Sequence, residues 1–123
     1  MKVLITEDEE FLLTAIEFRL KKQGYETLFV SSDSSIMTTI LEQKPDLVII
    51  GADTPKLDIT DLVLTLKEKT NPSIPIIIIA ALEAGEKILE WMNLGVDDFL
   101  TKPFKPAELV LRVSRVFQER GLK

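Results

Sequence analysis

The chain has 123 residues, of which 46% are hydrophobic and 28% charged, so it is long enough for one folded domain and is not extensively disordered. It contains no cysteine and no histidine, which excludes disulfides, thiolate chemistry, a Ser-His-Asp triad and metal sites built on those residues. The net charge of −5 does not favour binding to nucleic acid by this domain.

The first half of the chain alternates short apolar runs with amphipathic stretches. The run 3–5 predicts a buried strand, and apolar residues at helical spacing over 11–20 predict the helix that follows. The run 25–30 predicts a second strand. A helical stripe at 36–41 then leads to a third strand at 47–50.

The second half repeats this alternation. A stripe at 62–66 predicts the third helix, and 76–79 is the most hydrophobic strand. A helix is expected at 87–94, followed by a short strand at 98–101. The last helix carries apolar residues over 106–117 and begins with a proline, which suits the first turn of a helix.

Five strands and five helices in alternation predict one α/β domain over residues 1–123. Because the strands are apolar on both faces, they fit a parallel sheet that helices cover on both sides. Right-handed crossovers then favour a doubly wound order, in which ligands bind beyond the carboxyl ends of the strands. The candidate site residues are those that follow the strands, namely Glu7, Asp8, 51–55, Ala80, Ala81 and 101–103.

Four consecutive acids follow the first strand. Acids repel phosphate and attract a hard cation held by oxygen, so Glu7 and Asp8 are a candidate metal site. Capping of the following helix is the alternative, and it is the better interpretation of Glu9 and Glu10. Lys102 follows the last strand, where a lysine can hold a phosphoryl or carboxylate group, and we expect it to be the counter-cation of Asp8.

Six segments of the chain resemble the receiver domain of two-component response regulators. They are 3–9, 45–50, Pro55-x-x-Asp58, 74–78, 95–104 and Glu108-Leu109-x-x-Arg112-Val113, which together span nearly the whole chain. The resemblance implies a flavodoxin-like, doubly wound sheet with strand order 2-1-3-4-5 and five helices. It also implies a role in phosphorelay signal transduction, with an aspartate at the end of the third strand as the phosphoacceptor and magnesium beside it.

The resemblance assigns roles to several residues. It makes Glu7 and Asp8 the acidic pair that holds magnesium and Lys102 the lysine of the phosphate pocket. It implies a cis peptide bond before Pro103, and it makes Phe99 the switch aromatic, which we expect to rest inward.

Two positions depart from the family pattern. The acceptor position is the residue that follows the run 47–50, and it is Gly51, which has no nucleophile. The Ser/Thr position after the fourth strand is Ala80, which cannot donate a hydrogen bond. We therefore predict a degenerate receiver, or pseudo-receiver, that is not an enzyme, needs no cofactor and binds Mg²⁺ weakly at most.

Two alternatives stay open. The first is a phosphorylatable receiver that uses Asp53, although we expect this acid to hydrogen-bond its own turn. The second is a small flavodoxin-like enzyme or flavin carrier, against which the acidic first loop and the lack of a glycine-rich phosphate loop argue.

The expected partners are proteins: a histidine kinase, an output domain or another regulator. A homodimer through the fourth helix, the fifth strand and the last helix is a further candidate, with Asp97 and Arg112 as interface residues. Trp91 fits core packing best, and a partner contact is its alternative role. The longest apolar run, 76–82, is too short to cross a bilayer, so we expect no membrane contact, and the lack of cysteine favours a cytoplasmic location.

Overall fold

The computed structural model describes residues 1–32, 35–54 and 56–122. The strands are β1 (Lys2–Thr6), β2 (Glu26–Phe29), β3 (Leu47–Gly51), β4 (Ile76–Ala81) and β5 (Asp98–Lys102). The helices are α1 (Glu10–Lys22), α2 (Ile36–Gln43), α3 (Ile59–Lys69), α4 (Gly85–Asn93) and α5 (Pro106–Glu119), with a short 3-10 turn, η1 (Leu82–Ala84), before α4.

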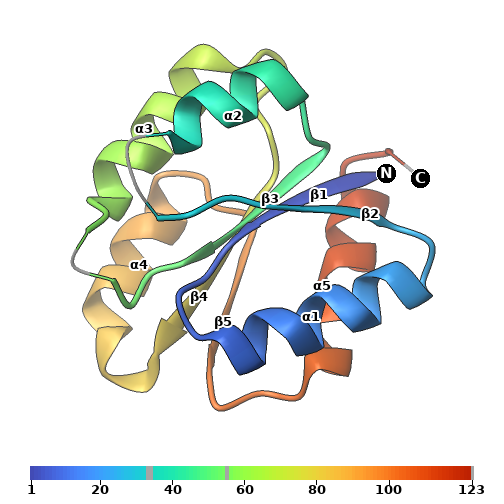
Figure 1. Ribbon diagram of the computed structural model, residues 1–123. Helices are drawn as coiled ribbons and strands as arrows, with labels where there is room; N and C mark the ends of the chain where they lie inside the picture. The colour runs from blue at the N-terminus through green and yellow to red at the C-terminus, as the bar shows by residue number, and fades with distance from the viewer. Residues whose placement is uncertain (33–34, 55, 123) are drawn as a thin grey trace.

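All neighbouring strands pair in parallel, in the order β2-β1-β3-β4-β5. The predicted flavodoxin-like order and the five helices are therefore confirmed. Helices α1 and α5 lie on one face of the sheet and α2, α3 and α4 on the other (Figure 1). This arrangement places the carboxyl ends of β1, β3, β4 and β5 at one edge of the molecule.

The helices cover a separate hydrophobic core on each face of the sheet. Alternate residues of the central strands point to opposite faces, so that Leu4 and Ile78 pack under α2, α3 and α4, whereas Ile5 and Ile77 pack under α1 and α5. Every residue of β3 is buried. Double burial explains why these strands read as continuous apolar runs rather than as an alternating pattern.

Some element boundaries differ from the predicted ones. β4 continues to Ala81, because its pairing with β5 extends through the two alanines. α3 begins at Ile59, where the Asp58 carboxylate accepts the Asp61 N–H at 3.0 Å and so caps the helix. None of the helices in the described part of the chain is long and apolar enough to span a membrane.

Candidate functional site

A hollow of about 330 Å³ lies at the edge of the sheet that the sequence predicts to hold the site. Its walls come from the ends of β1, β3 and β5 and from the loop that follows β3. The residues that line it are Glu7, Asp8, Glu9, Gly51, Asp53, Thr54 and Lys102. The structure therefore brings the predicted acidic pair, the predicted acceptor position and the predicted lysine together.

Lys102 is the centre of charge in this hollow. Its Nζ lies 3.2 Å from Glu7 Oε2, 3.3 Å from Glu9 Oε2 and 3.3 Å from Asp53 Oδ2. Burial of the amine lowers the pKa of Lys102, but the charge of Glu7 and the hydrogen bonds to Glu7, Glu9 and Asp53 outweigh it, so the pKa lies above the ordinary value. An ammonium group has three donors, and three carboxylates already engage them here.

Glu7 is buried, with 5% of its surface exposed, and its two carboxylate oxygens have different surroundings. Oε2 accepts the Glu9 N–H at 2.8 Å as well as the bond from Lys102. Oε1 has no hydrogen-bond partner among the described residues. A Cβ atom on Gly51 would collide with this Oε1 and would also lie 3.0 Å from the Thr6 carbonyl oxygen. The Glu7 carboxylate therefore occupies the space that any side chain at position 51 would need.

Asp8 points away from Glu7 and bonds to the loop after β2. The Ser32 hydroxyl donates a hydrogen bond of 2.6 Å to Asp8 Oδ1. The pKa of Asp8 is lowered, first by this bond and then by the bond from Thr54, with smaller contributions from the charges of Lys56 and Lys102. Lys102 thus favours the ionised form of Asp8 through its charge, as predicted, but its direct ion pairs are with Glu7, Glu9 and Asp53.

Two acids lie differently from the prediction. Glu9 is the N-cap residue of α1, but its side chain makes no capping bond and reaches Lys102 instead. Asp53 does not bond to its own turn in the described residues: its Oδ1 accepts the Ala81 N–H at 2.8 Å, and its Oδ2 contacts Lys102. The reason is that β3 and β4 are neighbours, so the loop after β3 passes the end of β4.

The structure also places most of the other positions that the resemblance singles out. Gly51 is the last residue of β3, and Ala80 is fully buried in β4. Phe99 is half-buried and packs against the core under α2, α3 and α4. The Lys102–Pro103 peptide bond is cis, as the resemblance predicts. The proline of the Pro55-x-x-Asp58 motif lies outside the described residues.

Trp91 lies inside the protein. Its exposed fraction is 6%, and it packs in the same core as Phe99. Its indole Nε1–H donates a hydrogen bond of 3.1 Å to Thr60 Oγ1. This burial is what the packing role of Trp91 predicts, and it leaves little of the ring exposed for a partner to contact.

The two charged residues predicted at an interface bond within the chain. Asp97 accepts bonds from Arg120 Nε at 2.8 Å and from the Ile76 N–H at 3.0 Å. Arg112 donates to Oδ1 and Oδ2 of Asp98, at 2.9 and 3.1 Å. Sequence reasoning missed Asp98, which is 8% exposed. Asp97 and Asp98 are consecutive, so their side chains point in opposite directions, as those of neighbouring strand residues do. This alternation is the sequence signal that could have indicated different partners for the two acids, Arg120 and Arg112.

The residues of the hollow do not fit a magnesium ion. Mg²⁺ requires near-octahedral oxygen ligands, whereas here an ammonium group bridges three of the carboxylates. The described residues contain no group of three acidic side chains arranged to hold a metal. In this arrangement the Lys102 ammonium takes the place beside the carboxylates that a cation would need.

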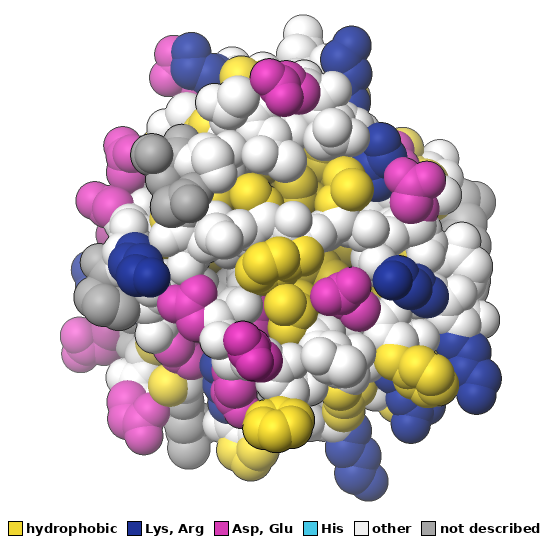
Figure 2. Space-filling view, viewed as in Figure 1, with side chains coloured by type: hydrophobic (Ala, Val, Ile, Leu, Met, Phe, Trp, Pro, Cys, Tyr) yellow, Lys and Arg dark blue, Asp and Glu magenta, His cyan; other side chains and the backbone are white. Residues whose placement is uncertain are grey.

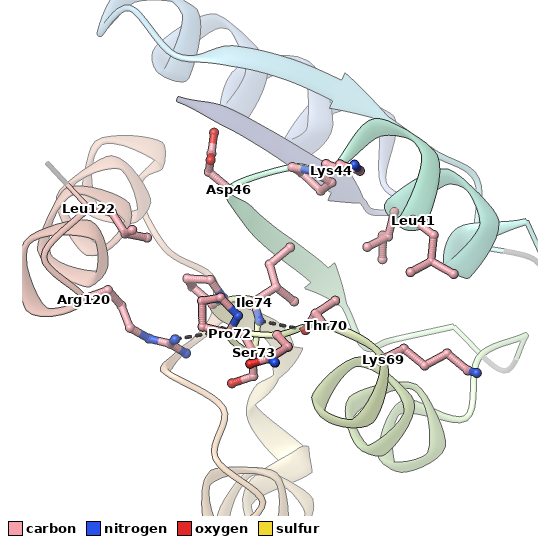
Figure 3. A pocket seen from close by; sticks show the side chains of 14 residues that line it. Leu41, Lys44, Asp46, Lys69, Thr70, Pro72, Ser73, Ile74, Arg120 and Leu122 are labelled. Carbon is pink, nitrogen blue, oxygen red and sulfur yellow. Dashed lines mark hydrogen bonds between the residues drawn. The ribbon is translucent and has the colours of Figure 1, made fainter.

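A larger hollow, of about 530 Å³, lies at the opposite end of the strands (Figure 3). Its polar groups are largely occupied. Arg120 donates to the Ser73 carbonyl oxygen at 2.8 Å, and Thr70 Oγ1 accepts the Ile74 N–H at 2.9 Å (Figure 3). These bonds connect the loop before β4 to α3 and α5, and they indicate a structural role for this end of the molecule.

Comparison with known proteins agrees with the geometry. Residues 3–114 match the model of the family described as the response regulator receiver domain. The phosphate regulon transcriptional regulatory protein PhoB of Pseudomonas aeruginosa is 32% identical over 120 residues, which are 97% of this chain and 52% of that protein. The alkaline phosphatase synthesis transcriptional regulatory protein PhoP of Bacillus subtilis is 31% identical over 118 residues, which are 95% of this chain and 48% of that protein. The chain thus spans about half the length of these relatives.

Solved structures give the same result. A response regulator receiver domain protein from Clostridium thermocellum superposes with a TM-score of 0.87 and 27% identity, and the match covers 98% of this chain and 97% of that one. The receiver domain of a Francisella response regulator has a TM-score of 0.84 and 29% identity, with 97% and 98% covered.

Proposed function

Since the chain belongs to the response regulator receiver domain family, we propose that it is a pseudo-receiver, a signalling module of a two-component or phosphorelay system that acts without phosphorylation of an aspartate. The observation that carries the proposal is the contact between Glu7 and Gly51. A glycine ends β3, and the Glu7 carboxylate lies over it. This position therefore has no nucleophile, and a side chain there would require the Glu7 carboxylate to move.

The charges in the hollow also oppose the entry of a phosphoryl group. Three carboxylates compensate the single ammonium of Lys102, so the hollow carries an excess of negative charge. A phosphoryl donor brings further negative charge, and bringing like charges together in a partly buried site is costly. Without a bound divalent cation, nothing in the described part of the hollow offsets that cost.

Ala80 and Phe99 support the same proposal. Ala80 is buried without a hydroxyl that would bond to a phosphoryl oxygen. Phe99, which the resemblance makes the switch aromatic, already packs against the core under α2, α3 and α4. We propose that the face formed by α4, β5 and α5 is held in one state by packing.

Such a module acts through contacts with other proteins and not as an enzyme. We propose a histidine kinase, an output domain or another regulator as its partner. The matched relatives are named transcriptional regulatory proteins, and their remaining length leaves room for an output domain.

The proposal is tested by incubating the chain with acetyl phosphate and Mg²⁺ and measuring its intact mass. We expect no added phosphoryl group under conditions in which a phosphorylatable receiver is labelled to completion. Stoichiometric labelling that hydroxylamine removes would contradict the proposal, because hydroxylamine cleaves acyl phosphates.

One observation favours a second candidate, phosphorylation of Asp53. Its carboxylate lines the hollow and lies 3.3 Å from Lys102. The Asp53→Asn variant separates the two candidates, because it keeps the side-chain size and removes the nucleophilic carboxylate. If the unaltered chain is labelled and Asp53→Asn is not, Asp53 is the acceptor and the pseudo-receiver proposal fails.

A further inference from the structure

The outer side of α1 exposes two phenylalanines. Phe11 is 91% and Phe18 is 62% exposed, and a spacing of seven residues puts them on the same side of the helix. The opposite side of α1 carries Ile16 and Leu20, which are buried against the sheet. Figure 2 shows yellow side chains protruding over α1, with magenta ones toward its start and dark blue ones at its end. The core of this protein therefore leaves these two rings uncovered.

A shallow hollow of about 310 Å³ lies between α1 and α5. Arg19 and Lys22 contribute to it from the last turns of α1, and Leu111, which is 70% exposed, contributes from α5. Lys22 Nζ also lies 5.7 Å from the centre of the Phe18 ring. The hollow thus combines apolar carbon with two cations, a surface that suits an aromatic ring flanked by acids.

The same helix carries such a ring at its other end. Phe11 follows Glu9 and Glu10, which are exposed acids at the start of α1. The last turn of α1 is basic, with Arg19, Lys21 and Lys22. From Phe11 to Lys22 is about 16 Å along the helix at 1.5 Å per residue. The acidic start of α1, with its protruding Phe11, is therefore complementary to the basic hollow at the end of α1 in a second copy of the chain.

We propose that two copies of this chain pair through antiparallel α1 helices, with Phe11 of each copy in the hollow between α1 and α5 of the other. A two-fold axis across the middle of α1 makes both contacts at once, as a closed symmetric dimer requires. The contact also places the acidic start of each α1 opposite the basic end of its partner. This surface differs from the α4, β5 and α5 face, where Asp97 and Arg112 are bonded within the chain.

The proposal is tested by sedimentation equilibrium of the chain. The contact is small, so a reversible dimer is expected over about 10 μM to 1 mM, as for weak interfaces of low area. Phe11→Ser is expected to weaken association about tenfold or more, as truncation of a central aromatic side chain does. Leu89→Ser is the matched control, since Leu89 is 66% exposed on α4 and lies outside the proposed contact. The circular dichroism of both variants checks that they remain folded.

A charge exchange identifies the second copy as the occupant. Lys22→Glu alone and Glu10→Lys alone are expected to be monomeric, because each puts like charges at both contacts. An equal mixture of the two variants is expected to regain dimers, because both contacts then join opposite charges. A chain that stays monomeric at all concentrations, or a dimer that Leu89→Ser disrupts and Phe11→Ser does not, would overturn the proposal.

Discussion

Glu7 and Lys102, 95 positions apart in the chain, form a partly buried ion pair at 3.2 Å, and the second oxygen of Glu7 covers Gly51. At the carboxyl ends of the strands, Lys102 therefore partly offsets the negative charge of the hollow, and Glu7 takes the space beside the acceptor position. The expected outcomes below follow mainly from this arrangement and from the ion pairs that Arg112 and Arg120 make within the chain.

Gly51→Ala is expected to destabilise the protein by about 1–3 kcal/mol, as overpacking of a buried site does. The added methyl would meet the Glu7 carboxylate. The loss of stability from Gly51→Ala is expected to be smaller in a Glu7→Ala background. Urea denaturation of the unaltered chain, the two single variants and the double variant measures the coupling energy between the two positions. Gly85→Ala is the control, because its methyl would meet nothing within 4 Å and Gly85 begins a helix, so this change is expected to be neutral or stabilising. Equal costs for Gly51→Ala in both backgrounds would show that the two residues do not compete for space.

Lys102 is expected to stabilise the fold up to alkaline pH. Its pKa is raised in the folded state, so its contribution is complete below the ordinary value of 10.5 and is lost as pH rises through the folded pKa. The free energy of unfolding is measured against pH for the unaltered chain and for Lys102→Gln. The difference between them is expected to be constant to about pH 10 and to fall above it. A difference that grows above pH 10 has the wrong sign for a raised pKa.

Arg120→Ala is expected to cost about 1–3 kcal/mol, the range for loss of hydrogen bonds between charged, partly buried groups. The change leaves Asp97 and the Ser73 carbonyl oxygen without their arginine. Arg115→Ala is the matched control on the same helix. Arg115 is 59% exposed and lies 3.4 Å from Asp98, so its loss is expected to cost less than about 1 kcal/mol. Thermal unfolding of both variants provides the comparison.

Trp91 is expected to be shielded from acrylamide, because 6% of its surface is exposed and it is the only tryptophan. The reference is a Trp91→Phe, Phe11→Trp chain, whose new ring takes a position where the native side chain is 91% exposed. Equal quenching of the unaltered chain and of this reference chain would show that Trp91 is accessible.

Thr60→Val is expected to lower the free energy of unfolding by about 1–3 kcal/mol, since it leaves the buried indole N–H without its acceptor.

Addition of 10 mM Mg²⁺ is expected to leave the melting temperature of the unaltered chain unchanged within error. This concentration is about tenfold above a millimolar dissociation constant, so binding of that strength would raise the melting temperature. Lys102 already forms ion pairs with the carboxylates that a metal would need. Lys102→Met removes this cation, and we expect the variant to be stabilised by Mg²⁺ more than the unaltered chain is. Stabilisation of the unaltered chain by micromolar Mg²⁺ would contradict this prediction.

The fold could be predicted because buried parallel strands leave a strong trace in the sequence. The runs 47–50 and 76–79 are apolar without interruption, and each is followed by a helical stripe, which restricts the sheet to few topologies. The same topology predicts that Glu7 and Lys102 share one edge of the sheet, and they do. Boundaries are less well determined: Ala80 and Ala81 extend β4, although alanine has no strong preference for strands.

The partners of individual side chains could not be predicted in the same way. The conformation at the end of β1 decides which of the adjacent acids, Glu7 or Asp8, turns inward. Glu7 therefore bonds to Lys102, whereas Asp8 bonds to Ser32. The bond from the Ala81 N–H to Asp53 joins the end of β4 to the loop after β3, 28 positions away in the chain. No local pattern encodes such contacts, because they depend on where neighbouring strands stop.

The shared space of Glu7 and Gly51 also constrains the order in which the two positions can change during evolution. A lineage that first gains a side chain at position 51 passes through an overpacked protein. A lineage that first shortens residue 7 passes through one in which Lys102 has lost its nearest carboxylate. Each single substitution lowers stability before a second one can compensate, so the two positions are expected to change rarely one at a time. Selection for an acidic side chain at position 51 would have to change both residues together, or begin from a protein with stability to spare.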